Sequence, residues 1–489
     1  MQMFFRNPQS KIPSLLREGI FFLILTITVG LSGGCDSKDL KLIDLVRIDE
    51  GSVLLAAKYD KAQHFVVYRD GSPEIWAHDD VSAEMGPVKK ISKLDENLIA
   101  IITEKNGIYL FPIGALSSGS AYTHLPVEEG ALVDKKIRSI YYYDYHGSRR
   151  LYVLYETPKG SGATEILLKD GLTVDRYNHL DKQSSDLRSN SVVQIAIDMK
   201  GNVWFNYSRK EEMGLSRLDS KGEWVHFNQA NSELPDKFVR TLRSEGADDG
   251  VDGDNIWFAS ISGLTRLEYK PGEKDEEDRE KWKLYGERET TAGLIARAIG
   301  VRALVSDAVL DIIDLHVIEK NILMANIGGV YTFNGKSTNR YIPDSIGGLN
   351  DTQISDINYR DGFVIVKTRP AGKQYINVDS VSLLDLKKRK WIKIRHWDIN
   401  KDYPTNMYFI PYKKGLDFVA MTYQNSASVF ALFNYETMEL KKIEFTMPVK
   451  PPDAVASEIQ PGMTPSTEQA PIQPEPEKQQ NEPETQAVQ

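Results

Sequence analysis

The 489-residue sequence predicts an all-β fold, a β-propeller of seven or eight four-stranded blades followed by a disordered C-terminal tail. Three observations predict this class. Two adjacent stretches share one succession of short strands, fainter copies of that unit recur along the chain, and apolar residues alternate with polar ones instead of following a helical rhythm. A repeat of about 50 residues is the length of a propeller blade.

The two clearest copies lie side by side in the middle of the chain. The first reads SVVQIAIDMKGNVWFNY from Ser191, then GLSRLD and EWVHF, and the second reads KFVRTLRSEG from Lys237, then NIWFAS, GLTRLE and KWKLY. Each begins with an alternating apolar strand and a turn, continues with a strand that carries Trp-Phe, and ends with a Gly-Leu turn and two more strands. The unit is therefore a four-stranded antiparallel meander.

Weaker copies occur at 98–114 and 322–335. Further strand pairs are expected at 44–58 with 64–76, 137–155 with 164–170, 353–368 with 376–386, and 406–421 with 427–444. A single meander cannot bury both of its faces, whereas meanders stacked around an axis bury them and leave few free edges. We expect about eight units, and seven stays open because the two outermost units could share one blade.

The amino terminus reads as a secretory signal. Its first 18 residues carry Arg6, Lys11 and Arg17, and the nearly apolar stretch 19–31 that follows is too short to cross the roughly 30 Å hydrocarbon core of a membrane comfortably. The next residues, Leu-Ser-Gly-Gly-Cys, end at Cys35.

This segment closely resembles the lipobox of bacterial lipoproteins. The resemblance implies cleavage before Cys35 and lipidation of its thiol and new amino group, and two or three acyl chains hold a protein firmly on a membrane. Cys35 is the only cysteine, which excludes an intramolecular disulfide and a cysteine-based zinc site. We expect a protein of the cell envelope on the periplasmic side of the inner or outer membrane, and Asp36 resembles an inner-membrane retention signal.

These patterns divide the chain into four parts. They are a lipoprotein signal peptide at 1–34, an anchor linker at 35–40, the β-propeller at 41–446 and a tail rich in Pro, Gln and Glu at 447–489. The tail has no aromatic residue and cannot bury enough apolar area to fold, which predicts disorder. Within the propeller, residues 271–306 interrupt the repeat with a charged loop and an apolar stretch that is either a surface helix or a partner-binding element.

The blade pattern GNVWF, GLSRLD and EWVHF, followed by NSELPDKFV, resembles the two-component-regulator propeller repeat. In that family the repeats form the extracytoplasmic sensor of hybrid histidine kinases and also occur in free-standing proteins. The resemblance covers about a third of the chain well. Because we find no kinase and no DNA-binding helices in this sequence, it implies ligand binding rather than direct signalling.

Charge and motifs argue against several functions. The formal net charge is −9, from 60 basic and 69 acidic residues, and no Lys/Arg-rich stripe stands out, so we expect no nucleic-acid partner. No HExxH, GxGxxG or phosphate loop occurs in the mature chain, the eight His are scattered, and the acidic turn 248–254 does not fit an EF-hand register. We therefore expect no catalytic residue, no cofactor and no metal site.

The repeated aromatic and basic residues have structural interpretations. We expect inter-blade packing from the Trp residues of the two clearest copies, namely Trp204, Trp224, Trp257 and Trp282. Arg217 and Arg266 recur after Gly-Leu and are expected to form ion pairs or hydrogen bonds between repeats.

The function that the sequence favours is a non-enzymatic platform. A lipid on Cys35 would hold the propeller on a membrane, where it binds a ligand, an envelope protein or a glycan. Two alternatives remain open. One is a propeller enzyme, either quinoprotein-like or a lyase, because the strands at 195–205 resemble those of streptogramin lyases. The other is an envelope-assembly scaffold lipoprotein.

Overall fold

A computed structural model of the chain describes residues 40–447 with gaps. The gaps are 60–61, 77–81, 116–121, 128–130, 146, 157–160, 170–171, 199, 209–213, 246–254, 271–278, 287–311, 319–320, 327–328, 342–351, 371–379, 395–404, 424–425 and 446. The predicted signal peptide, Cys35, Asp36, the acidic turn 248–254, most of the insert and the tail lie outside the described residues.

The described strands form eight antiparallel four-stranded sheets, which we call blades 1 to 8. Blade 1 holds β1 (Lys41–Asp49), β2 (Ser52–Tyr59), β3 (Ala62–Arg69) and β4 (Ser72–Ile75). Blade 2 holds β5 (Val88–Asp95), β6 (Leu98–Thr103), β7 (Ile108–Pro112) and β8 (Thr123–Leu125). Blade 3 holds β9 (Ile137–Tyr145), β10 (Ser148–Tyr155), β11 (Ala163–Leu168) and β12 (Val174–Leu180). Blade 4 holds β13 (Val192–Ile197), β14 (Val203–Tyr207), β15 (Leu215–Leu218) and β16 (Trp224–Phe227).

Blades 5 to 8 follow the same plan. Blade 5 holds β17 (Val239–Ser244), β18 (Asn255–Ser260), β19 (Gly263–Lys270) and β20 (Arg279–Gly286). Blade 6 holds β21 (Asp314–Ile318), β22 (Asn321–Asn326), β23 (Gly329–Phe333) and β24 (Thr338–Tyr341). Blade 7 holds β25 (Thr352–Arg360), β26 (Phe363–Pro370), β27 (Ser380–Asp385) and β28 (Lys390–Lys393). Blade 8 holds β29 (Asn406–Lys413), β30 (Leu416–Thr422), β31 (Val429–Asn434) and β32 (Glu439–Ile443). The helix α1 (Ser82–Met85) and a 3-10 turn (Ile113–Ala115) are short additions to this plan.

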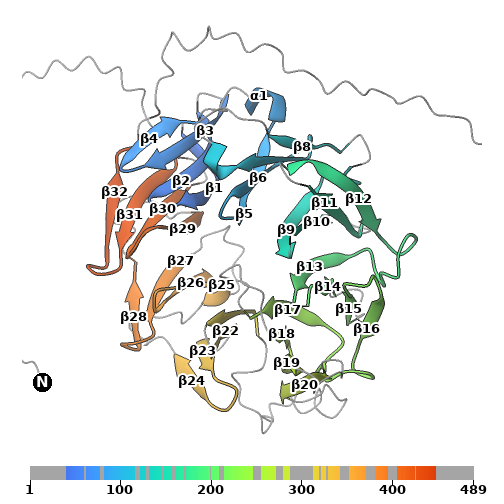
Figure 1. Ribbon diagram of the computed structural model, residues 1–489. Helices are drawn as coiled ribbons and strands as arrows, with labels where there is room; N and C mark the ends of the chain where they lie inside the picture. The colour runs from blue at the N-terminus through green and yellow to red at the C-terminus, as the bar shows by residue number, and fades with distance from the viewer. Residues whose placement is uncertain are drawn as a thin grey trace, which may run out of the picture. The chain divides into compact units, whose positions relative to one another are not determined.

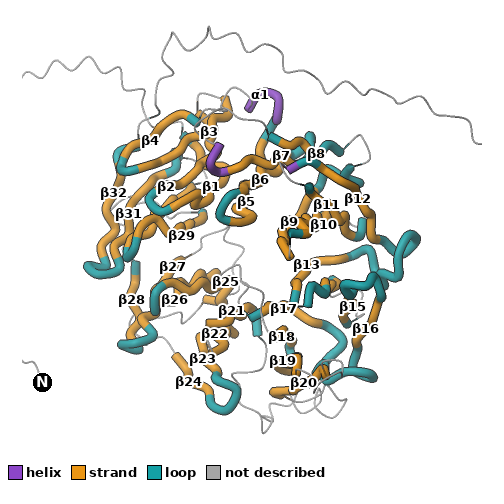
Figure 2. Tube along the Cα trace, viewed as in Figure 1, coloured by secondary structure: helices purple, strands orange, loops and turns teal. Residues whose placement is uncertain are grey.

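The eight blades are arranged in a ring around a central axis (Figure 1). The tube view shows how completely strands make up this ring (Figure 2). Within each blade the strands pair in chain order, and the first strand lies nearest the axis, beside the first strands of its neighbours. This confirms the predicted propeller and resolves the blade number as eight.

The second strand of each blade lies between two neighbouring sheets, which explains its composition. All five residues of β14, VWFNY, are buried, and so are all six of β18, NIWFAS. Burial on both faces requires apolar or internally bonded side chains, so the Trp-Phe pairs of the repeat lie here. Trp204 packs against Phe258 of the next blade with ring centroids 5.3 Å apart. The predicted inter-blade role of this tryptophan is thereby confirmed.

An acid anchors each of the tryptophans Trp204 and Trp257. Asp198 is fully buried, and one of its carboxylate oxygens accepts from Trp204 Nε1 and from Asn202 Nδ2, each at 2.9 Å. In blade 5 Glu245 plays the same part and accepts from Trp257 Nε1 at 2.7 Å. The acid-turn-Trp spacing that resembles a lyase strand is therefore explained here by the folding of the blade.

One type of hydrogen bond recurs between the innermost strands of neighbouring blades. A side chain of the innermost strand accepts a hydrogen bond from a backbone N–H of the next blade's innermost strand. Asp44 accepts from Ile91 at 2.7 Å, Gln194 from Leu242 at 3.0 Å and Asp314 from Ile357 at 3.5 Å. These hydrogen bonds, which we call brackets, fix the position of one blade relative to the next along the propeller axis.

The bracket at Asp314 belongs to a larger charged cluster. The carboxylate lies 3.7 Å from Arg243 Nη2 and 3.6 Å from His316 Nε2. Burial alone would raise the pKa of Asp314, but His316 and Arg243 outweigh it and hold that pKa below its usual range. Burial and the nearby Asp314 raise the pKa of Asp356 in blade 7. The cluster therefore links blades 5, 6 and 7 near the axis.

The ring closes between blades 8 and 1 without exchanging a strand. Tyr68 of β3 packs against Phe418 of β30 with ring centroids 5.1 Å apart. The backbone N–H of Ser428 donates to Leu40 O at 2.8 Å, and Lys413 lies 2.9 Å from Asp70. Side-chain packing and a few polar contacts therefore hold the two ends of the ring together.

Candidate functional site

The sheets radiate from the axis, so neighbouring sheets diverge toward the outer edge of the propeller and define a wedge that side chains can fill (Figure 1). Between blades 4 and 5 large side chains close this wedge. Trp282 of β20 stacks on Phe258 and lies 5.2 Å from Phe227, while Arg217 forms an ion pair with Glu280. The Arg217 pair thus joins two repeats as predicted.

Between blades 3 and 4 the wedge stays open and forms a groove of about 710 Å³. Its lining combines charged, small polar and a few apolar residues, namely Arg150, Glu165, Arg176, Asn178, Leu180, Lys182, Gln183, Ser184, Ser185, Asp186, Leu218, Asp219, Ser220, Lys221, Gly222 and Trp224. We call it the 3/4 groove. A concavity of this size accommodates a small ligand or a short peptide.

Apolar residues form the base of the 3/4 groove. Leu180, Leu218 and Trp224 line it and pack on the cluster of buried side chains between blades 3 and 4. The Trp224 ring lies 5.2 Å from that of Phe205 and is half-buried. This tryptophan therefore packs between blades, as predicted, and also borders the groove.

One wall of the groove is the polar face of blade 3. Glu165 is only 4% exposed, and its carboxylate lies within hydrogen-bond distance of three donors. These are Tyr152 Oη at 2.8 Å, Arg150 Nη1 at 3.0 Å and Asn178 Nδ2 at 3.3 Å. Burial and the Glu165 charge raise the pKa of Tyr152 well above its usual value, so this phenol stays protonated and donates.

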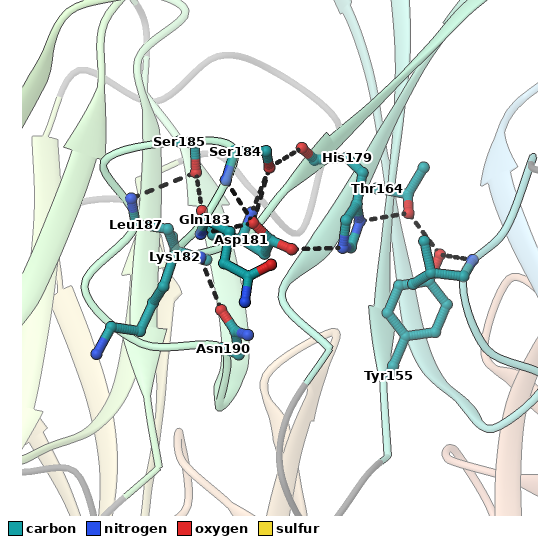
Figure 3. Close-up of polar contacts among 11 residues, drawn as sticks. Tyr155, Thr164, His179, Asp181, Lys182, Gln183, Ser184, Ser185, Leu187 and Asn190 are labelled. Atoms are coloured by element: carbon teal, nitrogen blue, oxygen red, sulfur yellow. Dashed lines mark hydrogen bonds and ion pairs between the residues drawn. The ribbon is translucent and has the colours of Figure 1, made fainter.

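The opposite rim is the turn that leads from β12 into blade 4 (Figure 3). Asp181 begins this turn, and its carboxylate accepts from the backbone N–H groups of Gln183 at 2.8 Å and Ser184 at 2.7 Å. These hydrogen bonds and the Ser184 hydroxyl lower the pKa of Asp181. The hydroxyl of Ser185 donates to the Asp181 carbonyl at 2.6 Å, so the rim is firmly positioned.

A chain of polar contacts ties this turn to the interior of blade 3 (Figure 3). Tyr155 Oη lies 2.6 Å from Thr164 Oγ1, which lies 3.4 Å from His179 Nδ1, and His179 Nε2 lies 3.5 Å from Asp181. Burial raises the pKa of Tyr155 to about 12. The Ser184 hydroxyl contacts Asp181 and the His179 carbonyl, each at 2.8 Å, rather than the imidazole. In blade 3 the hydroxyl beside the His179 imidazole is therefore that of Thr164 and not that of Ser184.

Blade 4 contains the same network of polar contacts. Because the network recurs, we interpret it as a structural feature of the blade. Tyr207 Oη lies 2.5 Å from Ser216 Oγ, which lies 2.7 Å from His226 Nδ1. The following turn repeats as well, because Ser232 donates to the Asn228 carbonyl as Ser185 does to Asp181. The sequence carries this second repeat signal as HLDKQSSDL at 179–187 and HFNQANSEL at 226–234.

The groove lining carries four basic and three acidic side chains, a net charge of +1 in an otherwise acidic chain. Arg150 faces Glu165, whereas the side chains of Arg176, Lys182 and Lys221 form no ion pair with another described residue. Asp186 and Asp219 line the groove too, and one oxygen of Asp219 accepts two backbone N–H groups of its own turn. Outside the Arg150–Glu165 pair, the lining therefore holds three basic and two acidic side chains.

Cys35, the one predicted site residue, and three of the eight histidines lie outside the described part of the chain. These histidines are His78, His146 and His396. Of the remaining histidines, His179 and His316 each contact an aspartate, and the described part of the chain contains no group of three or more potential metal ligands. Arg266 differs from the expectation, because it pairs with Glu245 and Glu268 of its own blade. No described helix is long and apolar enough to cross a membrane.

Comparison with known proteins gives no family. No family model matches the chain, and no curated protein does. Among solved structures, the extracellular domain of the hybrid two component system BT3049 from B. thetaiotaomicron is 11% identical, with a TM-score of 0.32 over 82% of this chain. An AfRom2 CNH domain is 7% identical, with a TM-score of 0.39 over 81% of this chain and 95% of its own. A prolyl endopeptidase is 10% identical, with a TM-score of 0.43 over 73% of this chain.

The chain spans 64% of the BT3049 domain and 49% of the endopeptidase. We draw no functional conclusion from these likenesses.

Proposed function

We propose that this protein is a lipid-anchored, non-enzymatic binding platform of the cell envelope, and that the 3/4 groove is its binding site. The observation that carries the proposal is the open wedge between blades 3 and 4, lined by polar side chains whose neighbours hold them in place. A preformed concavity binds at a lower ordering cost, since much of its wall is fixed before the ligand arrives.

The chemistry around the groove supports binding rather than turnover. Glu165 is surrounded by three donors, and Asp181 is occupied by the hydrogen bonds of its own turn. The His179 contacts recur around His226 in blade 4, where they belong to the blade. Each of these acid and imidazole groups thus has a structural role.

The anchor part of the proposal depends on Cys35 and is tested by itself. Cells that express the full-length chain are labelled with a radioactive fatty acid, and membrane and soluble fractions are compared for the wild type and Cys35→Ser. We expect label and membrane retention in the wild type and neither in the variant. A wild-type chain that takes up no label would contradict the anchor.

The binding part is tested by capture from detergent-solubilised envelopes with the full-length tagged protein as bait. We expect one envelope component to be recovered in a stoichiometric amount. A small molecule that the purified protein converts, with no component captured, would instead support the enzyme alternative.

A further inference from the structure

We propose that the ligand of the 3/4 groove is an extended acidic segment of a partner protein, which adds to the free edge of β12 as a fifth strand. This inference rests on the proposed function and specifies its partner. It combines three observations, namely an exposed strand edge, uncompensated basic side chains beside that edge, and a groove that can hold the side chains of an added strand.

The strand edge is the first observation. β12 is the outermost strand of blade 3 and pairs with β11 alone among the described strands. Its residues Asp175, Arg176, Tyr177 and Asn178 are exposed in succession. By contrast, no residue of β16 at the same place in blade 4 is exposed. An outer strand that is open on its edge and both faces offers backbone N–H and C=O groups to an incoming strand.

The distribution of charge decides what kind of strand fits. Asp175 faces away from the groove lining and pairs with Lys169, and Arg150 is matched by Glu165. Arg176, Lys182 and Lys221 remain without a described ionic partner, and they outnumber the other two acids of the lining, Asp186 and Asp219. Basic side chains that converge on one groove select carboxylates and repel basic segments.

The dimensions agree with a short segment. The seven residues of β12 span about 23 Å at about 3.3 Å per residue. Alternate side chains of an added strand would point to the same face as Arg176 and Asn178, which line the groove. A segment with acidic residues at every second position therefore places its carboxylates beside Lys182 and Lys221.

The binding test uses fluorescence anisotropy with fluorescein-labelled heptapeptides and the purified protein. The probe is Glu-Val-Glu-Val-Glu-Val-Glu, compared with its Lys-Val counterpart and with a version that has proline at the central position. We expect the acidic peptide to bind at least about tenfold more tightly than the basic one, with affinity falling as salt rises. The proline version should bind more weakly, because proline removes one N–H from the pairing edge.

Two protein variants locate the site. K182E/K221E should lower the affinity for the acidic peptide by about tenfold or more. The matched control K105E/K441E reverses the charge of two exposed lysines outside the groove lining and should bind the peptide like the wild type. Hydrogen exchange should show protection of residues 174–180 when the peptide is bound, which a purely ionic contact would not produce.

Several results would overturn the inference. They are equal binding of the acidic and basic peptides, unchanged affinity in K182E/K221E, or binding with no protection of β12. A trigalacturonate probe that binds while the peptide does not would assign the groove to acidic glycans instead. If the inference is wrong but the proposed function is right, K182E/K221E will still capture the envelope component that the wild type captures. If the proposed function is wrong, the wild type itself will capture no such component.

Discussion

The Gln194 bracket offers a direct test of how the blades are joined. Gln194 of β13 binds both backbone groups of Leu242 in the next blade, with its Oε1 3.0 Å from the N–H and its Nε2 2.9 Å from the carbonyl oxygen. Gln194→Met keeps the length of the side chain and removes both of these hydrogen bonds, together with the longer contact of Nε2 with Thr241 Oγ1 at 3.4 Å. At about 1 kcal/mol for each bond, we expect the free energy of unfolding to fall by about 2 kcal/mol.

The assay is urea unfolding of the purified protein, followed by tryptophan fluorescence. The midpoint should fall while the slope stays constant, because the surface exposed on unfolding does not change. Gln183→Met, at an exposed position, is the matched control and should stay within about 0.5 kcal/mol of the wild type. Hydrogen exchange at the Leu242 amide should also become faster. A loss no larger than that of the control would refute the claim that brackets hold adjacent blades.

Three further predictions follow from buried polar groups. Glu165→Gln leaves Arg150 without its carboxylate, so stability should fall by about 1–2 kcal/mol in urea while anisotropy shows tighter binding of the acidic heptapeptide. Trp204→Phe removes the indole donor from buried Asp198 and should lower the free energy of unfolding by about 2 kcal/mol, measured in the same way. Burial raises the folded-state pKa of Asp44, so the wild type should lose stability as pH rises from about 4 through that raised pKa. Asp44→Asn should lack this loss, and urea midpoints at pH 4 and pH 8 that change equally in both proteins would contradict it.

The sequence predicts the fold well because one blade contains nearly all the information for its own sheet. The turn at Asp198, the buried Trp204 and the Gly-Leu turn lie within one repeat, and each has a local physical reason. Blade number is less accessible, because it depends on how many faint copies close the ring. The aromatic packing between Tyr68 and Phe418, which joins opposite ends of the propeller, has no local pattern that would reveal it.

The candidate site was not predicted, and the reason is geometric. Glu165 of β11 takes its donors from the neighbouring strands β10 and β12, and the groove that it lines also includes a turn of the next blade. The groove therefore exists only once two blades are docked. Its polar character follows from alternate residues such as Arg176 and Asn178, which read from sequence as an ordinary solvated strand. Arg217 pairs with a residue of the next blade, whereas Arg266 pairs within its own blade. The two residues occupy the same place in the repeat, so the sequence alone does not tell these outcomes apart.

The way the ring closes has a consequence for how the molecule can change. Because each of the eight described sheets is built from consecutive strands, no sheet depends on a strand from the far end of the chain. The seam between the first and last blades can therefore loosen, through its aromatic contacts and the Lys413–Asp70 pair, while every hydrogen-bonded ladder stays whole. A gain or loss of one blade during descent would likewise leave each remaining sheet with all four of its strands, and only the contacts between blades would have to form anew.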